Sequence, residues 1–163
     1  MGDVEVALTD ALESHPTFEA DDGTFRLTSA ALESSVSVHG STLRVRVWIP
    51  TLGEVVTDDE PSPVVEDAWF DTLERRLLEG YDVTRSTAAA GAEVGRSDTE
   101  VVVTYTIESD TPSTAVDDAK ALIEYAIGTY VQGAIPGYTY DTPLGDLLET
   151  AIGRGKHGTQ SSG

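Results

Sequence analysis

Residues 43–50 read Leu-Arg-Val-Arg-Val-Trp-Ile-Pro, and they give the clearest signal of secondary structure in the chain. Apolar side chains alternate there with Arg44, Arg46 and Trp48, and a period of two is typical of a strand with one buried and one exposed face. Pro50 lacks a backbone N–H and is expected to end the strand. The stretch therefore predicts a β-strand whose exposed face carries two arginines and a tryptophan.

Working outward from this strand, the same patterns assign the rest of the chain. Extended segments are expected at residues 25–32, 34–38, 81–87 and 101–107, with a turn at residues 39–41 and a flexible connection at 88–98. Apolar residues at helical spacing predict helices at residues 3–14, 63–80 and from about 113 to 133, and a short one at 144–152. Ser62 and Pro63 suit the start of the second helix, and Gly80 is the expected carboxy-terminal cap.

This order of elements, α-β-β-β-α-β-β-α, predicts an α+β fold in which helices pack on one face of an antiparallel sheet of about five strands. Residues 1–152 are expected to form a single domain, and the Gly/Ser-rich residues 153–163 a disordered tail. The order is similar to that of type III secretion chaperones and related small chaperone-like domains. The similarity is one of topology, so it implies little about function.

The charge of the chain is strongly unbalanced. Its 163 residues include 29 Asp and Glu against 10 Lys and Arg, a net charge of −19, and only Lys120 and Lys156 are lysines. Repulsion on this scale destabilises a compact state unless salt screens it, and at molar salt the Debye length falls to roughly 3 Å. We interpret the acidity as a hydrated coat adapted to a high-salt cytoplasm.

The composition also excludes several classes of function. A nucleic-acid partner is disfavoured because phosphate contacts need clustered lysines and arginines. The chain has no cysteine, which removes disulfides and thiolate sites. Its first residues lack the pattern of a secretory signal, and no apolar run approaches the roughly 20 residues that cross a bilayer, so we expect a cytoplasmic protein without a membrane partner.

Two segments resemble a known family. Residues 64–76 read VVEDAWFDTLERR and residues 129–138 read TYVQGAIPGY. Together with the residues around them they resemble a family of uncharacterised haloarchaeal proteins of about this length. The resemblance implies a halophilic source and carries over no known activity.

No group of residues predicts catalysis, a cofactor or a metal site. His15 and His39 lie at an expected helix end and turn, and His157 lies in the tail, so none is placed for acid–base chemistry. No Gly-rich phosphate loop is present, and the acidic residues 58–60 lack the ligand spacing of a calcium loop.

Two surfaces are candidates for binding. The first is the exposed face of the strand, because Arg and Trp are frequent hot spots of interfaces; alternatively, the arginines pair with Glu100 or Glu108 and the carboxy-terminal segment covers Trp48. The second is the Tyr-rich stretch from Tyr125 through Tyr140, at and beyond the end of the last long helix; alternatively, the chain folds back there to seal the core. The candidate binding residues are Arg44, Arg46, Trp48, Tyr130, Gln132, Tyr138 and Tyr140.

These observations favour a non-enzymatic protein-binding or chaperone-like module. Its partner is an unknown protein, and a second copy of the chain is one candidate. The alternative is a small-ligand-binding protein or an enzyme that uses tyrosine and carboxylate side chains near the carboxy-terminal segment.

Overall fold

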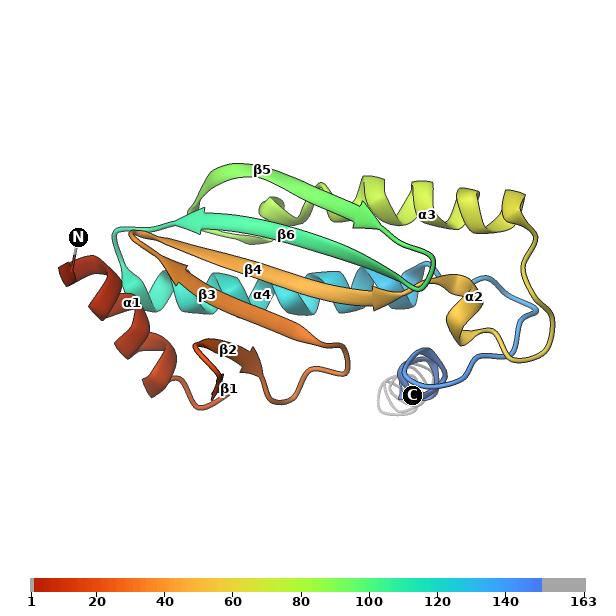
Figure 1. Ribbon diagram of the computed structural model, residues 1–163, viewed down its shortest axis with the longest axis horizontal. Helices are drawn as coiled ribbons and strands as arrows, with labels where there is room; N and C mark the ends of the chain where they lie inside the picture. The colour runs from red at the N-terminus through yellow and green to blue at the C-terminus, as the bar shows by residue number, and fades with distance from the viewer. Residues whose placement is uncertain (1, 151–163) are drawn as a thin grey trace, which may run out of the picture.

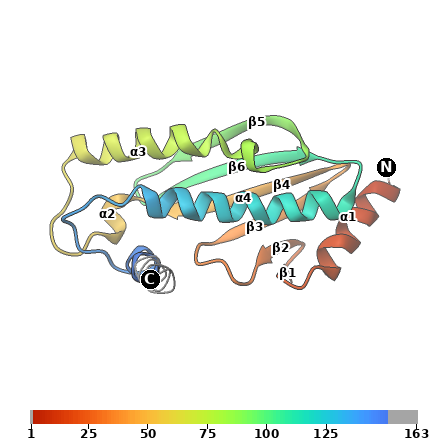
Figure 2. The same ribbon diagram turned by 180° about the vertical axis from the view of Figure 1, so that it is seen from behind.

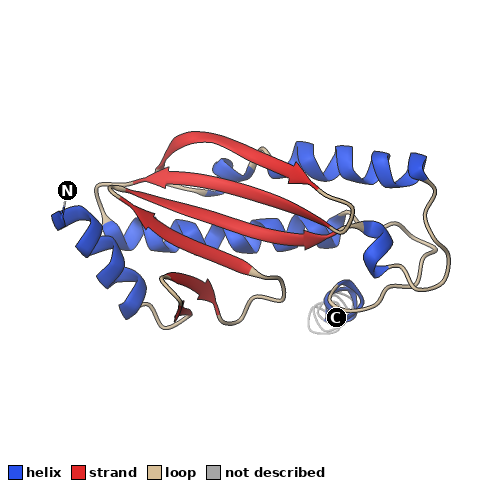
Figure 3. Ribbon diagram, in the orientation of Figure 1, coloured by secondary structure: helices blue, strands red, loops and turns tan. Residues whose placement is uncertain are grey.

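A computed structural model describes residues 2–150. Six antiparallel strands form one sheet in the order β1-β2-β3-β4-β6-β5, so the predicted α+β class is confirmed (Figures 1 and 3). The strands are β1 (Phe18–Asp21), β2 (Thr24–Leu27), β3 (Ser34–His39), β4 (Thr42–Pro50), β5 (Thr87–Arg96) and β6 (Glu100–Glu108).

The helices gather on one side of this sheet (Figures 1 and 2). They are α1 (Gly2–Ser14), α2 (Leu52–Val55), α3 (Pro63–Leu77) and α4 (Pro112–Gln132), with a short 3-10 helix η1 (Gly80–Val83) and a last helical segment at residues 144–150. Figure 2 shows α4 running along the back of the strands with α3 beside it. The predicted tail at residues 153–163 lies outside the described residues.

The core forms between α4 and the sheet. Alternate residues of the two central strands are buried as the sequence pattern predicts: Leu43, Val45, Val47 and Ile49 in β4, and Val101, Val103, Tyr105 and Ile107 in β6. The predicted stripe of α4 covers them, with Val116, Ala119, Ile123, Ala126 and Tyr130 buried. The opposite side chains of β4 and β6 therefore point away from every long helix.

The start of α3 is as predicted, but its end is not. The Ser62 side chain accepts a hydrogen bond from the Val65 amide at 3.3 Å, and Pro63 opens the helix. The helix ends at Leu77, and Gly80 is buried in η1 rather than acting as a left-handed cap. A Cβ at Gly80 would lie 2.5 Å from the Tyr105 hydroxyl oxygen, so this glycine is required by close packing.

The prediction for residues 81–98 was wrong. Residues 80–83 form η1 instead of a strand, and the expected flexible connection is the long edge strand β5. Its Ala- and Gly-rich sequence has little strand propensity, but it pairs along the free edge of β6, and this tertiary pairing overrides local preference. Tyr81 stabilises the irregular register, because its hydroxyl donates to the Ala90 carbonyl at 2.8 Å and accepts from the Thr106 amide at 2.9 Å.

The amino-terminal part of the sheet contains a hairpin that the sequence patterns missed. β1 and β2 pair from Phe18 opposite Leu27 to Asp21 opposite Thr24. The connecting residues Asp22 and Gly23 both have positive φ, 49° and 86°, as a two-residue hairpin turn requires. The extended segment expected at residues 25–32 therefore ends at Leu27, and a loop leads to β3.

Candidate functional site

The candidate site is the outer face of the sheet, on the side that faces the viewer in Figure 1 and that no helix of residues 2–150 covers. We call its centre the open face. Its side chains come from alternate positions of three neighbouring strands: Ser35 and Ser37 in β3, Arg44, Arg46 and Trp48 in β4, and Val102, Thr104 and Thr106 in β6.

The pairing register arranges these side chains in rows across the strands. Arg46 lies between Ser35 and Thr104. Arg44 lies in the same way between Ser37 and Thr106, and the Ser37 hydroxyl is 2.9 Å from a ring nitrogen of His39. Each guanidinium group is thus flanked by a hydroxyl on both neighbouring strands, and such a setting favours an anionic or polar contact.

Arg44 and Arg46 form no ion pair within residues 2–150. The ion pairs of this part of the chain involve other cations, namely His15, Arg26, Arg85, Arg96 and Lys120. Glu100 and Glu108 lie at the two ends of β6, opposite Pro50 and Thr42, and Glu108 accepts a hydrogen bond from the Ser41 hydroxyl at 2.7 Å. The alternative in which these acids neutralise the arginines therefore does not hold.

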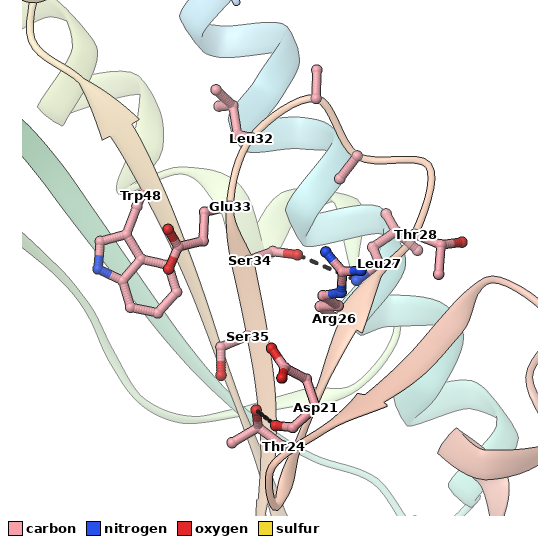
Figure 4. A pocket seen from close by; sticks show the side chains of 12 residues that line it. Asp21, Thr24, Arg26, Leu27, Thr28, Leu32, Glu33, Ser34, Ser35 and Trp48 are labelled. Atoms are coloured by element: carbon pink, nitrogen blue, oxygen red, sulfur yellow. Dashed lines mark hydrogen bonds between the residues drawn. The ribbon is translucent and has the colours of Figure 1, made fainter.

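Trp48 is partly buried and borders three surface hollows of about 580, 450 and 320 Å³. Figure 4 shows the largest, with Trp48 and Glu33 on one side and Arg26, Leu27 and Thr28 on the other. It opens where β2 and β3 diverge, since one residue pair, Phe25 and Val36, joins those strands. Pro143 lines the smallest hollow, so the carboxy-terminal segment flanks the indole and leaves it partly exposed.

The second hollow crosses β4, β6 and β5 and owes its space to a glycine. It is lined by Arg46 and Trp48 of β4, Glu93, Val94 and Gly95 of β5, and Val102 and Thr104 of β6. Gly95 lies opposite Val102, and a Cβ there would meet nothing within 4 Å. The part of the second hollow next to Gly95 is therefore free of side chains. Nothing in the sequence pattern indicated this.

Two tyrosines of the second candidate surface, Tyr130 and Tyr140, pack against the rest of the protein and are not free to bind a partner. Tyr130 is 0% exposed, and burial raises the pKa of its hydroxyl. The Tyr140 hydroxyl donates to the Ile135 carbonyl at 2.9 Å and accepts from the Ile135 amide at 2.8 Å, and burial raises its pKa as well. Gln132 is exposed and Tyr138 half-buried.

Backbone contacts tie this segment to α2. The Thr57 amide donates to the Thr139 carbonyl at 2.9 Å, and the Asp141 amide donates to the Val55 carbonyl at 2.7 Å. The alternative in which the segment seals the core is therefore supported. The structure does not join Tyr130 and Tyr140 with the arginines in one site.

A buried carboxylate that the sequence patterns did not single out lies on α4. Asp118 is 3% exposed and accepts hydrogen bonds from the Arg85 amide at 3.1 Å, the Ser86 amide at 2.7 Å and the Ser86 hydroxyl. Because the carboxylate oxygens of Asp118 are occupied by these hydrogen bonds, the side chain holds the loop before β5 in place and is not available to react with a ligand. A polar residue within the apolar stripe of α4 was the available signal.

Within residues 2–150, no three His, Asp or Glu side chains are grouped closely enough to hold a metal ion. Asp58 of the acidic loop accepts a hydrogen bond from the Thr139 amide at 3.0 Å. None of the helices in that range combines the length and the apolar character that crossing a membrane requires.

Comparison with known proteins identifies the family. Residues 13–150 match DUF5813, a family of unknown function, and the chain therefore belongs to it. No curated protein matches the sequence. Among solved structures it resembles that of YbjN from E. coli, described as a proposed transcription regulator, with a TM-score of 0.45 and 10% identity over 78% of this chain and 91% of that one. The resemblance to an uncharacterised family is thus confirmed.

Proposed function

We propose that this member of a family of unknown function is a non-enzymatic module that binds another protein through the open face of its sheet. One observation carries the proposal: among residues 2–150, Arg44 and Arg46 form no ion pair, and with Trp48 they lie on the face of the sheet that none of the described helices covers. Interface hot spots are enriched in tryptophan and arginine and lie near the centre of the contact.

The shape of the face supports a protein partner more than a small ligand. The three hollows beside Trp48 are open to solvent and spread over β2 to β5, whereas ligand pockets enclose most of the ligand surface. Shallow neighbouring hollows suit several side chains of one partner. The alternative small-ligand site loses its main residues, because Tyr130 is buried and the Tyr140 hydroxyl is bound internally.

The acidity suggests the setting in which the module works. With 29 acids against 10 cations, the surface suits a cytoplasm of high salt concentration, and we propose a halophilic source. A second copy of the chain is included among the candidate partners, and sedimentation velocity in molar KCl tests this directly.

The test of the proposed function is copurification at molar KCl from the native source. Gly95→Val fills the second hollow without removing any group, and Trp48→Ala removes the indole. We expect both variants to lose a partner that the wild type retains, while Arg75→Gln, which changes an exposed arginine of α3, retains it. Equal partner recovery with all four proteins, each shown to be folded by circular dichroism, overturns the assignment of this face.

A further inference from the structure

The open face is charged differently from the rest of the molecule. Its eight side chains include two arginines and no acid, while the whole chain carries a net charge of −19. Acids border these eight side chains: Glu33 lies beside Trp48, Glu93 of β5 lines the same hollow as Arg46, and Glu100 and Glu108 lie at the ends of β6. Two arginines bordered by acids attract a negatively charged group of a ligand and restrict it to the position of the arginines.

The arginines also have a defined spacing. Arg44, Arg46 and Trp48 occupy alternate positions of β4, and a strand rises roughly 3.3 Å per residue, so neighbouring side chains of this row are about 6.6 Å apart. One small anion is too short to contact both guanidinium groups fully. An extended peptide has the same repeat, and carboxylates at its alternate positions would meet Arg46 and Arg44 in turn.

We propose that the open face binds an extended acidic segment of a partner protein, which lies along β4 with carboxylates on Arg44 and Arg46 and an apolar side chain beside Trp48. Guanidinium groups bind carboxylates through paired hydrogen bonds, and the flanking hydroxyls of Ser35 and Thr104 can donate to the same oxygens. This inference rests on the proposed function and names the chemistry of the partner.

High salt is a condition of this binding. At low salt, the net charge of −19 repels any acidic peptide over the long range. In 1 M KCl the Debye length is roughly 3 Å, so the distant repulsion is screened while hydrogen bonds and apolar contact with Trp48 remain. The binding experiment is therefore done in 1 M KCl on the full chain.

The probe is a dye-labelled octapeptide, Thr-Glu-Thr-Glu-Thr-Leu-Thr-Thr, whose two Glu and one Leu have the spacing of Arg44, Arg46 and Trp48, and its binding is measured by fluorescence anisotropy. Matched octapeptides replace every Glu by Gln or by Lys. We expect the acidic peptide to bind roughly tenfold more tightly than the Gln peptide, and Arg44→Gln or Arg46→Gln each to weaken it by roughly five- to tenfold. Arg46→Lys, which keeps the charge but not the paired hydrogen bonds, is expected to weaken it less than Arg46→Gln.

The control variant Arg75→Gln removes the same charge from α3 and should leave the affinity unchanged. If Arg75→Gln and Arg46→Gln have equal effects, or if the Lys peptide binds more tightly than the Glu peptide, the affinity depends only on the overall charge of the protein. Either result overturns the proposal. Tighter binding of an eight-nucleotide thymidylate than of the acidic peptide overturns it in favour of a nucleic acid. Thermal unfolding of each variant confirms that the fold is retained.

The two proposals fail in different ways. If the acidic peptide does not bind but Trp48→Ala and Gly95→Val still abolish copurification of a partner, the open face is a protein-binding site for a partner of other chemistry. If copurification is also unaffected, the proposed function itself is wrong.

Discussion

At the scale of single residues, two buried tyrosines differ in whether the hydroxyl group forms a hydrogen bond. The Tyr105 hydroxyl donates to the Leu77 carbonyl at 2.5 Å, whereas the Tyr130 hydroxyl is buried with no hydrogen-bond partner within residues 2–150. Burial is the main cause that raises the pKa of both hydroxyls well above the ordinary value of about 10. The two side chains therefore separate the effect of a hydrogen bond from that of burial.

We expect Tyr105→Phe to lower the free energy of unfolding by about 1–2 kcal/mol, because it leaves the Leu77 carbonyl without its donor. Tyr130→Phe removes a hydroxyl that has no partner, so it is expected to be neutral or to stabilise by up to about 1 kcal/mol. Urea denaturation at pH 8 in molar KCl measures both. A larger loss for Tyr130→Phe than for Tyr105→Phe contradicts the prediction.

Both substitutions also change the response to alkali. A tyrosine whose pKa is raised by folding stabilises the protein fully below the unfolded value of about 10, and this contribution is lost as pH rises above it. Each such tyrosine then costs about 1.4 kcal/mol between pH 8 and 11. Each Phe variant should therefore lose about that much less than the wild type over this range, and an identical loss in all three proteins would falsify the explanation.

At the scale of elements, α4 positions the loop before β5 through one carboxylate. Asp118 accepts two backbone amides and the Ser86 hydroxyl, and adjacent Asp117 forms exposed ion pairs with His15 at 3.5 Å and Arg85 at 3.9 Å. Buried charged acceptors contribute more than exposed ion pairs.

Asp118→Asn replaces one acceptor oxygen by an NH₂ group that faces donors. We expect it to lower the free energy of unfolding by about 2–4 kcal/mol, against less than about 1 kcal/mol for Asp117→Asn. Chemical denaturation of the two variants under one salt condition makes the comparison. Equal small losses would mean that Asp118 does not hold the loop.

The elements differ in how far their own sequences specify them. β4, β6, α3 and α4 follow from their apolar periodicity, and the start of α3 follows from Ser62 and Pro63. The hairpin of β1 and β2 carried a signal that was missed, since Asp22-Gly23 is a favoured two-residue turn. β5 carried none, because its alanines and glycines become a strand only when β6 offers an edge.

At the scale of the whole molecule, the net charge predicts a dependence on salt. We expect the domain to unfold or loosen when KCl falls from molar to about 0.1 M, because 19 uncompensated charges lose their screening. Circular dichroism across a KCl series measures this.

A matched variant separates screening of charge from the general effect of salt on apolar burial. Neutralising the exposed loop acids Asp59 and Glu60 by Asp59→Asn and Glu60→Gln should shift the midpoint of the transition to lower KCl. Full stability of the wild type in dilute buffer rules out the interpretation of the acidity as an adaptation to salt.

The excess of acidic residues, the two central strands, the long helix behind them and the outward direction of Arg44, Arg46 and Trp48 can all be read from the amino-acid sequence alone. These features depend on composition and on the regular alternation of neighbouring residues, which a strand or helix converts directly into faces. The candidate binding face was therefore visible before the fold was known.

The surroundings of that face depend on the three-dimensional structure. Within residues 2–150, Arg44 and Arg46 have no ion pair, the hollow at Gly95 is open, Tyr130 is buried, and Asp118 holds the loop before β5. Each of these depends on contacts between segments distant in sequence, where pairing register and close packing override local preference.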